Sequence, residues 1–230
     1  MIGVFVNAVS IVSGSIIGLF LRKKINRSVI DSIMPVVGLA TVFIGIKGAF
    51  VGEKSILLVI VLALGTFIGT IIGIDEKLYI LGDLIKKRFV KKYTDTKDNF
   101  VEGFVSSSIL FGVGAMCIMG SIEAGIKHEY TIFFLKSTLD FISAIIYAAS
   151  LGIGVAFSAL TIFLLQGTLT ILAGFIKFIG DNQSLMNEIS CVGNIIIVAI
   201  GLNVMGITKI KIANMLPAIF LTPIIFYIIK

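Results

Sequence analysis

Long apolar runs, separated by short polar stretches, dominate the pattern along the 230-residue chain. A membrane-spanning helix needs about 20 predominantly apolar residues, and eight runs come close to or reach that length. They cover residues 2–21, 32–50, 55–74, 100–122, 131–150, 155–176, 189–207 and 212–229. We therefore expect an all-α membrane protein with about eight transmembrane helices, forming a single polytopic domain over residues 1–230.

Composition points the same way. The chain is 57% apolar and 14% charged, with a mean hydropathy of +1.11, whereas globular domains are about 45–50% apolar and about 25% charged. Residues 141–176 contain no charged side chain at all. A disordered chain, a disulfide scaffold and a soluble enzyme are excluded. The net charge of +6 does not predict nucleic-acid binding, because the basic residues lie in short loops between apolar runs.

The basic residues are distributed unequally between the two sets of alternating loops. Thirteen Lys and Arg residues fall in the loops after the first, third and seventh runs, whereas five fall in the opposite set, and Lys136 lies inside the fifth run. Loops rich in Lys and Arg stay in the cytoplasm. We expect a multi-pass protein of the bacterial cytoplasmic (inner) membrane with both termini outside.

One polar segment, residues 75–98, carries apolar side chains at helical spacing between residues 76 and 92, among several Lys and Arg residues. This pattern predicts an amphipathic helix on the cytoplasmic membrane surface. A solvated linker is the alternative.

Glycine-rich segments recur along the chain. Residues 13–18 resemble 170–174, and residues 37–45 resemble 192–201. Matching spans 1–3 with spans 6–8 gives an offset of five, an odd number, so the two copies would lie upside down relative to each other as an inverted repeat. A parallel duplication that pairs the third and fourth spans with the first two is the competing match.

The turn at residues 151–154 joins the fifth and sixth spans closely, which leaves open whether this hairpin crosses the membrane fully. Its small residues offer a second role. Unwound backbone at such a break can coordinate an ion, so Ser150, Gly152, Gly154 and Ser158 are candidate lining residues, with a plain interhelical turn as the alternative.

Asp140 is the strongest candidate for chemistry. It lies about 14 Å along the fifth span, from Thr131 at about 1.5 Å per residue, and this depth is near the middle of a hydrocarbon core of about 30 Å. Lys136, four residues earlier, shares its helical face. Ionisable groups at this depth mark ion or proton sites. We expect Asp140 to bind a proton or cation, with Lys136 as a counter-charge that is released or re-paired. A fixed structural ion pair is the alternative.

Amide side chains in the spans form a second group. Gln166 and Asn194 are candidates for lining a substrate site because of their depth and their glycine-rich surroundings. Asn7 and Asn203 are expected to form hydrogen bonds between helices. Signatures of enzymes are missing: one histidine, His128, cannot provide a two-histidine metal site. We expect no catalytic residues, no metal and no cofactor.

Several short motifs resemble those of the bacterial YqgA/YdfK-like membrane proteins, a family of unknown function. They are Glu102-Gly-Phe, Gly114-Ala-Met, Gly120-Ser, Lys136-Ser-Thr-Leu-Asp140, the run from Ser150 to Ser158, Gln166-Gly167 and Asn214-Met-Leu-Pro217. The resemblance covers essentially the whole chain, and the block from Lys136 to Ser158 is its most specific part. It implies a multi-span inner-membrane protein of the kind usually labelled a transporter.

These observations favour a secondary transporter of a small solute or ion, coupled to H+ or another cation. An ion channel and a non-transporting structural or regulatory component of the membrane are the alternatives. The expected partners are the lipid bilayer and an unidentified small solute or ion, with no nucleic acid. Gly65, Gly69 and Gly73 share one face of the third span, and this face either joins subunits of a homo-oligomer or packs helices within one subunit.

Overall fold

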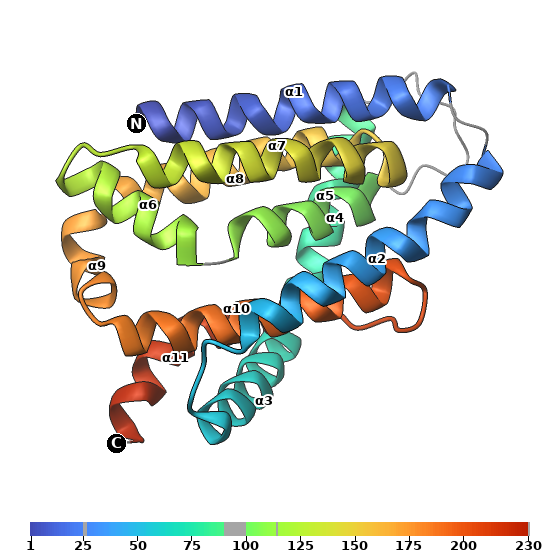
Figure 1. The fold of residues 1–230 in the computed structure, drawn as a ribbon. Coiled ribbons are helices and arrows are strands. Elements are labelled where there is room, and N and C mark those ends of the chain that lie inside the picture. Colours follow the sequence, from blue (N-terminus) through green and yellow to red (C-terminus); the bar gives the residue numbers. More distant parts are fainter. Residues whose placement is uncertain (25–26, 90–99, 114, 230) are drawn as a thin grey trace.

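The computed structural model describes residues 1–24, 27–89, 100–113 and 115–229, and every regular element among them is a helix (Figure 1). The elements are α1 (Ile2–Lys24), α2 (Arg27–Ala49), α3 (Ser55–Ile72), α4 (Ile74–Phe89), α5 (Phe100–Gly112), α6 (Ala115–Ile126), α7 (Thr131–Leu151), α8 (Gly154–Ile171), α9 (Ala173–Gly180), α10 (Gln183–Val204), the 3₁₀ helix η1 (Ile212–Met215) and α11 (Pro217–Ile228). The predicted all-α membrane architecture is confirmed.

Six of the described helices are long and apolar enough to span a membrane: α1, α2, α3, α7, α8 and α10. The expected fourth span is a pair, α5 and α6, bent by 60° at its break. The expected eighth span is short and starts as 3₁₀ helix, because Pro217 begins a new helix at its N1 position. Both arms of the hairpin at residues 151–154 are long enough to cross.

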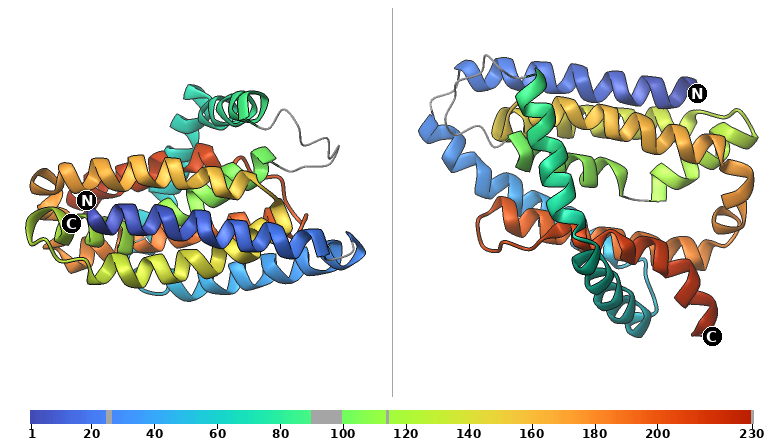
Figure 2. Two further views of the ribbon diagram at one scale, coloured as in Figure 1. Left: turned by 90° about the horizontal axis from the view of Figure 1, so that it is seen from above. Right: turned by 180° about the vertical axis from the view of Figure 1, so that it is seen from behind.

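The helices pack in two sets. α1, α7 and α8 lie side by side, α2 crosses α10, and α5 and α6 lie between the two sets (Figure 1). α4 crosses the opposite side of the bundle, where it packs on α5 (Figure 2). It falls within the segment expected to be amphipathic, and residues 90–98 of that segment lie outside the described part of the chain.

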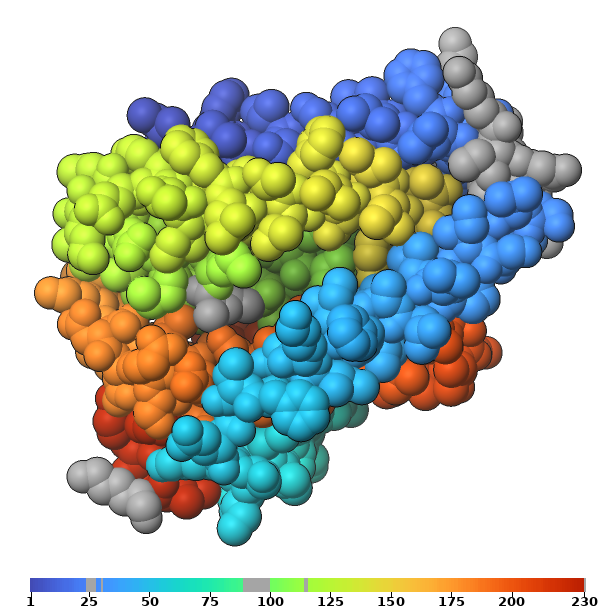
Figure 3. Space-filling view, in the orientation of Figure 1, coloured from blue at the N-terminus to red at the C-terminus, as the bar shows by residue number. Residues whose placement is uncertain are grey.

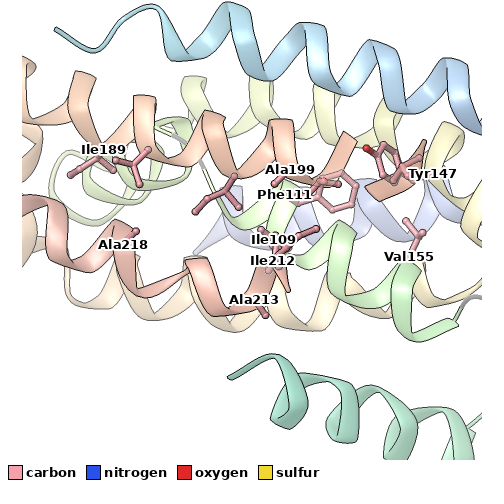
Figure 4. Packing of buried hydrophobic residues seen from close by; sticks show 14 of the residues in the cluster. Ile109, Phe111, Tyr147, Val155, Ile189, Ala199, Ile212, Ala213 and Ala218 are labelled. Carbon is pink, nitrogen blue, oxygen red and sulfur yellow. The ribbon is translucent and has the colours of Figure 1, made fainter. Parts of the chain in front are cut away.

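α10 provides the centre of the core. In its most apolar 18-residue stretch 72% of the residues are buried, against 22% in α2 and in α3. Ile189 and Ala199 of this helix pack with Ile109, Phe111 and Tyr147 in one apolar cluster (Figure 4). The cluster therefore joins α10 to both α5 and α7.

The outer helices present large apolar side chains at their surface. Examples are Phe5, Phe20, Phe43, Phe67, Ile71 and Phe220, each more than 60% exposed. A soluble monomer rarely shows apolar patches on this scale, whereas a bilayer accommodates them. The exposed apolar side chains thus match the bilayer contact expected from the sequence.

Glycines set the closest helix contacts. Gly14 and Gly18 of α1 lie against the backbone carbonyls of Phe141 and Ile145 on α7. Gly65 and Gly69 of α3 lie against α11 and η1 of the same chain. Small residues let helix backbones approach closely. These two glycines of α3 therefore pack helices within one subunit.

Replacing Gly69 by alanine is expected to lower the apparent melting temperature in detergent, because the new methyl group would overlap the Asn214 carbonyl oxygen. Overpacking of this kind costs about 1–3 kcal/mol. Gly174→Ala is the matched control, since a methyl group there meets no atom within 4 Å. Equal melting temperatures for the two variants would show that α3 and η1 are not in close contact.

Candidate functional site

The site is built around an ion pair on α7. The Lys136 Nζ lies 2.7 Å from Asp140 Oδ2 and 3.0 Å from Oδ1. Both residues are 7% exposed, and the four-residue spacing places the two side chains one above the other on the helix. The pair predicted from spacing is therefore present and buried inside the helical bundle.

Two amides from other helices complete the arrangement. The Asn7 Nδ2 of α1 donates to Asp140 Oδ2 at 3.0 Å and to Gln166 Oε1 of α8 at 3.2 Å. Asn7 and Gln166 are both fully buried. We call Asn7, Lys136, Asp140 and Gln166 the polar network. It connects the three helices that lie side by side in Figure 1.

The polar network is not saturated. Asn7 Oδ1, an acceptor, and Gln166 Nε2, a donor, have no hydrogen-bond partner within the described part of the chain. The Cys117 thiol lies beside Gln166, and a thiol is only a weak hydrogen-bonding group. Buried polar groups without partners are rare and costly. The network therefore holds an unused acceptor and an unused donor next to the Asp140 carboxylate.

Lys136 and Asp140 line a cleft of about 810 Å³ between α2, α5, α6, α7 and α10. This volume is within the usual range of small-molecule sites. Figure 3 shows the surface hollowed between the yellow-green side chains of α6 and α7 and the blue side chains of α2. On the α7 wall the Tyr147 hydroxyl lies 2.7 Å from the Thr41 hydroxyl of α2, so the two walls also touch.

The expected lining residues are found in different places. Asn194 lines the cleft on the α10 side, where its Nδ2 donates to the Ser190 carbonyl oxygen. Gln166 lies behind Asp140, in the polar network, and is not among the residues that line the cleft.

Of the four small residues near the hairpin, Gly152 lies in the α7–α8 turn, Ser150 and Gly154 lie at the adjoining helix ends, and Ser158 lies inside α8. Gly152, with a φ of 92°, allows the sharp reversal there. Gly154 lies against the Phe100 carbonyl oxygen, and the Ser158 hydroxyl donates to Val155. The Ser150 carbonyl oxygen accepts from Arg22. None of the four lines the cleft. In this structure Ser150, Gly152 and Gly154 lie at the interhelical turn, and a role in lining a site stays a prediction for all four.

Asn7 is the member of the polar network that was not expected in the site. From the sequence it was interpreted as a residue that holds helices together, and its contacts do join α1 to α7 and α8. Its partner is the central carboxylate. The only signal in the sequence is an amide within an apolar run, and such a signal does not identify the partner.

A second buried carboxylate, Glu188 of α10, was also not singled out. It is 1% exposed, and its Oε1 accepts from the backbone N–H groups of Glu53 and Lys54, just before α3 begins. Its Oε2 has no hydrogen-bond partner in the described part of the chain. A carboxylate at a helix N-terminus is stabilised by the helix dipole. Glu188 thus anchors the α2–α3 loop to α10.

Glu188→Ala is expected to destabilise this loop, because two hydrogen bonds to a charged acceptor are lost, each worth about 1.5–3 kcal/mol. Amide hydrogen exchange at residues 50–55 should accelerate at least tenfold. Asn187→Ala is the control, since the Asn187 side chain bonds only the exposed Gln183. If exchange at residues 50–55 is unchanged in Glu188→Ala, the carboxylate does not hold the loop.

No group of three or more His, Cys, Asp and Glu side chains forms a metal site among the described residues.

Comparison with known proteins places the chain in a family. The family described as "Protein of unknown function (DUF554)" matches residues 2–227. The chain belongs to this family. One relative is the "Uncharacterized membrane protein YdfK" of Bacillus subtilis (strain 168), which is 33% identical over all of this chain and 97% of the relative. Another is the "Uncharacterized protein YqgA" of Escherichia coli (strain K12), which is 29% identical over 96% of this chain and 94% of the relative. No solved structure matches the chain. The family resemblance expected from the motifs is confirmed, and so is the membrane character.

Proposed function

We propose that this DUF554 protein is a secondary transporter of a small solute, coupled to H+ or another cation at Asp140. The observation that carries the proposal is the exposure of the buried Lys136–Asp140 pair to a cleft of about 810 Å³. A pair that only held helices together would have no need of a cleft beside it. Ionisable side chains within a membrane face cavities chiefly where they handle ions or protons.

The bent helix pair α5–α6 supports this proposal. Phe111 and Val113 before the break, and Met116 and Cys117 after it, all line the cleft. Many transporters form their binding sites from interrupted helices. The glycines at positions 112 and 114 provide the sequence basis for a break.

The spacing of helix ends fits an inverted repeat and supports the proposal. Ile72 and Ile228, the last residues of α3 and α11, are 156 positions apart, and Ala49 and Val204, the last residues of α2 and α10, are 155 positions apart. A nearly constant offset between matched helix ends is what a duplicated three-span unit would leave in the chain.

Contacts between the matched helices fit the same repeat. α1 packs on α8, α2 on α10 and α3 on α11. A Cβ on Gly38 would lie 2.7 Å from the Gly201 carbonyl oxygen, and one on Gly45 would lie 2.8 Å from the Asn194 carbonyl oxygen, where residues 194 and 201 are the counterparts of 38 and 45 at an offset of 156. Reciprocal contacts of this kind arise where an element meets its own counterpart near a pseudo-twofold axis. In inverted-repeat transporters, two units of opposite orientation provide alternating access.

The orientation in the membrane is part of the proposal: an inner-membrane protein with both termini outside and α4 on the cytoplasmic side. A cysteine at Lys127 should be labelled by an impermeant thiol reagent on intact cells, and a cysteine at Lys209 only after the membrane is opened. Background labelling should be low, because Cys117 and Cys191 are buried. The reverse pattern would overturn the positive-inside assignment.

Purified protein in proteoliposomes that contain a pH-sensitive dye tests the transport proposal. Gradients of carboxylates, amines and metal cations are applied one class at a time, and proton movement is recorded. At least one class should move protons faster through wild-type vesicles than through vesicles with Asp140→Asn. If no class does so in folded, correctly inserted protein, coupled transport is rejected.

A further inference from the structure

We infer that the cleft binds a small organic carboxylate with an apolar body, and that Lys136 binds this carboxylate when Asp140 takes up a proton. This inference rests on the proposed function and assigns its substrate class. It comes from the charges of the cleft and from the two unused atoms of the polar network.

The charges of the cleft favour an anion. Its charged lining residues, among those described, are Lys47 of α2 and Lys136 and Asp140 of α7. The other titratable lining groups are Cys117 of α6 and Tyr147 of α7, and α5 and α10 contribute none. The lining therefore has one more positive charge than negative. Lys47 is exposed at the surface of α2, where it would attract anions toward the cleft.

The ion pair links the carboxylate to a proton. With Asp140 ionised, Lys136 already has its counter-ion and has no need of another. When Asp140 accepts a proton, the buried Lys136 ammonium is left without a counter-ion, which is strongly unfavourable in a low-dielectric environment. A bound carboxylate restores the balance by accepting hydrogen bonds from the Lys136 Nζ. Proton and carboxylate thus bind together, and the site keeps the same net charge when empty and when loaded.

The two amides suit both protonation states. With Asp140 ionised, the Asn7 Nδ2 donates to it and to Gln166 Oε1. If both amide groups rotate by half a turn, Asn7 Oδ1 accepts from the new Asp140 O–H and from Gln166 Nε2. In the observed arrangement Asn7 Oδ1 and Gln166 Nε2 lack partners, and these are the two atoms that the rotated arrangement uses. The unsaturated network therefore has the hydrogen-bonding capacity for a protonated Asp140.

The rest of the lining indicates the body of the ligand. Leu110, Phe111, Leu139 and Ile197 are apolar, and Asn187 and Asn194 provide neutral polar groups on the opposite wall. Pockets of this composition bury an apolar body and orient it through a few polar groups. A carboxylate attached to a small ring or branched chain meets both requirements.

Calorimetric titration of the purified protein with benzoate tests this inference, with benzamide as a neutral probe of the same shape and benzylamine as a cationic probe of similar size. Titration in buffers that differ in ionisation enthalpy gives the number of protons taken up per ligand. Wild type should bind benzoate with uptake of up to one proton, and the affinity should fall as the pH rises, by at most about tenfold per pH unit, as one-proton linkage requires. Benzamide and benzylamine should bind at least tenfold more weakly.

Two variants make the test specific. Asp140→Asn imitates the protonated carboxyl, so benzoate should bind without proton uptake and with an affinity that no longer depends on pH. Lys136→Gln should lose benzoate binding, whereas Lys127→Gln, the same charge change in an exposed loop, should bind as wild type. Circular dichroism confirms that each variant is folded.

Preferential binding of benzylamine, or no benzoate binding by folded wild-type and Asp140→Asn proteins, would overturn the assignment of an anion. A separate result would reject the transport proposal alone. If the protein binds benzoate with proton uptake but shows no solute-driven proton flux in proteoliposomes, it is a carboxylate-binding membrane protein that does not transport.

Discussion

Lys136→Met alone is expected to destabilise the protein by about 3–5 kcal/mol, whereas the double variant Lys136→Met/Asp140→Leu is expected to unfold close to wild type. Removing one partner of a buried ion pair leaves an uncompensated charge, but replacing both with apolar side chains removes the cost of burying them. Thermal unfolding in detergent measures the difference. The double variant should nevertheless be inactive in every proton-coupled flux assay.

The chain contains a matched control for this result. Glu123 lies in α6, and Lys127 follows directly after its last residue, with the same four-residue spacing. Their side chains are more exposed, 59% for Lys127 and 20% for Glu123, and the charged atoms are 3.9 Å apart. Lys127→Met should change stability by less than about 1 kcal/mol. If the double variant at Lys136 and Asp140 is as unstable as the single one, the ion pair itself stabilises the fold, and a structural role explains its presence.

Asp140→Asn is expected to reduce accumulation driven by a pH gradient at least tenfold, for any solute that wild-type proteoliposomes move. Asparagine keeps the shape of the side chain and its hydrogen bonding but cannot take up and release a proton. Exchange of labelled for unlabelled solute needs no net proton movement, so this exchange should persist. Asp140→Glu, which keeps the titratable group, should retain part of the accumulation. Full accumulation by Asp140→Asn would place the coupling site elsewhere.

Much of the fold could be predicted because the bilayer imposes a simple rule on sequence. A spanning helix must satisfy its backbone internally and present about 20 apolar residues, so runs such as residues 2–21 and 131–150 locate α1 and α7 closely. The bend between α5 and α6 could not be predicted in the same way. It lies inside a continuous apolar run, where Gly112 and Gly114 permit a break but do not require one.

Only the part of the candidate site formed by residues close together in the sequence could be predicted. Lys136 and Asp140 are one helical turn apart, so their pairing follows from helix geometry. Along the chain, Asn7 is 133 residues from Asp140 and 159 residues from Gln166, its two partners in the network. Contacts of that range depend on how α1, α7 and α8 pack together, through glycines whose partners the sequence does not specify.

The same reasoning explains the hairpin residues. Ser150, Gly152, Gly154 and Ser158 have the composition of an unwound ion site, but a tight turn between two antiparallel helices needs the same small residues. Composition cannot separate the two roles. In the structure Ser150 contacts α1 and Gly154 contacts α5, and the cleft lies elsewhere.

The central claim is that Asp140 gains and loses a proton in the folded protein, and infrared difference spectroscopy tests it without knowledge of the substrate. Protein in lipid is titrated from high to low pH, and the carbonyl stretching band of the protonated carboxyl group is recorded for wild type and for Asp140→Asn. We predict a band in wild type that is absent in the variant. Identical difference spectra for wild type and Asp140→Asn would show that Asp140 does not titrate, and would contradict the account.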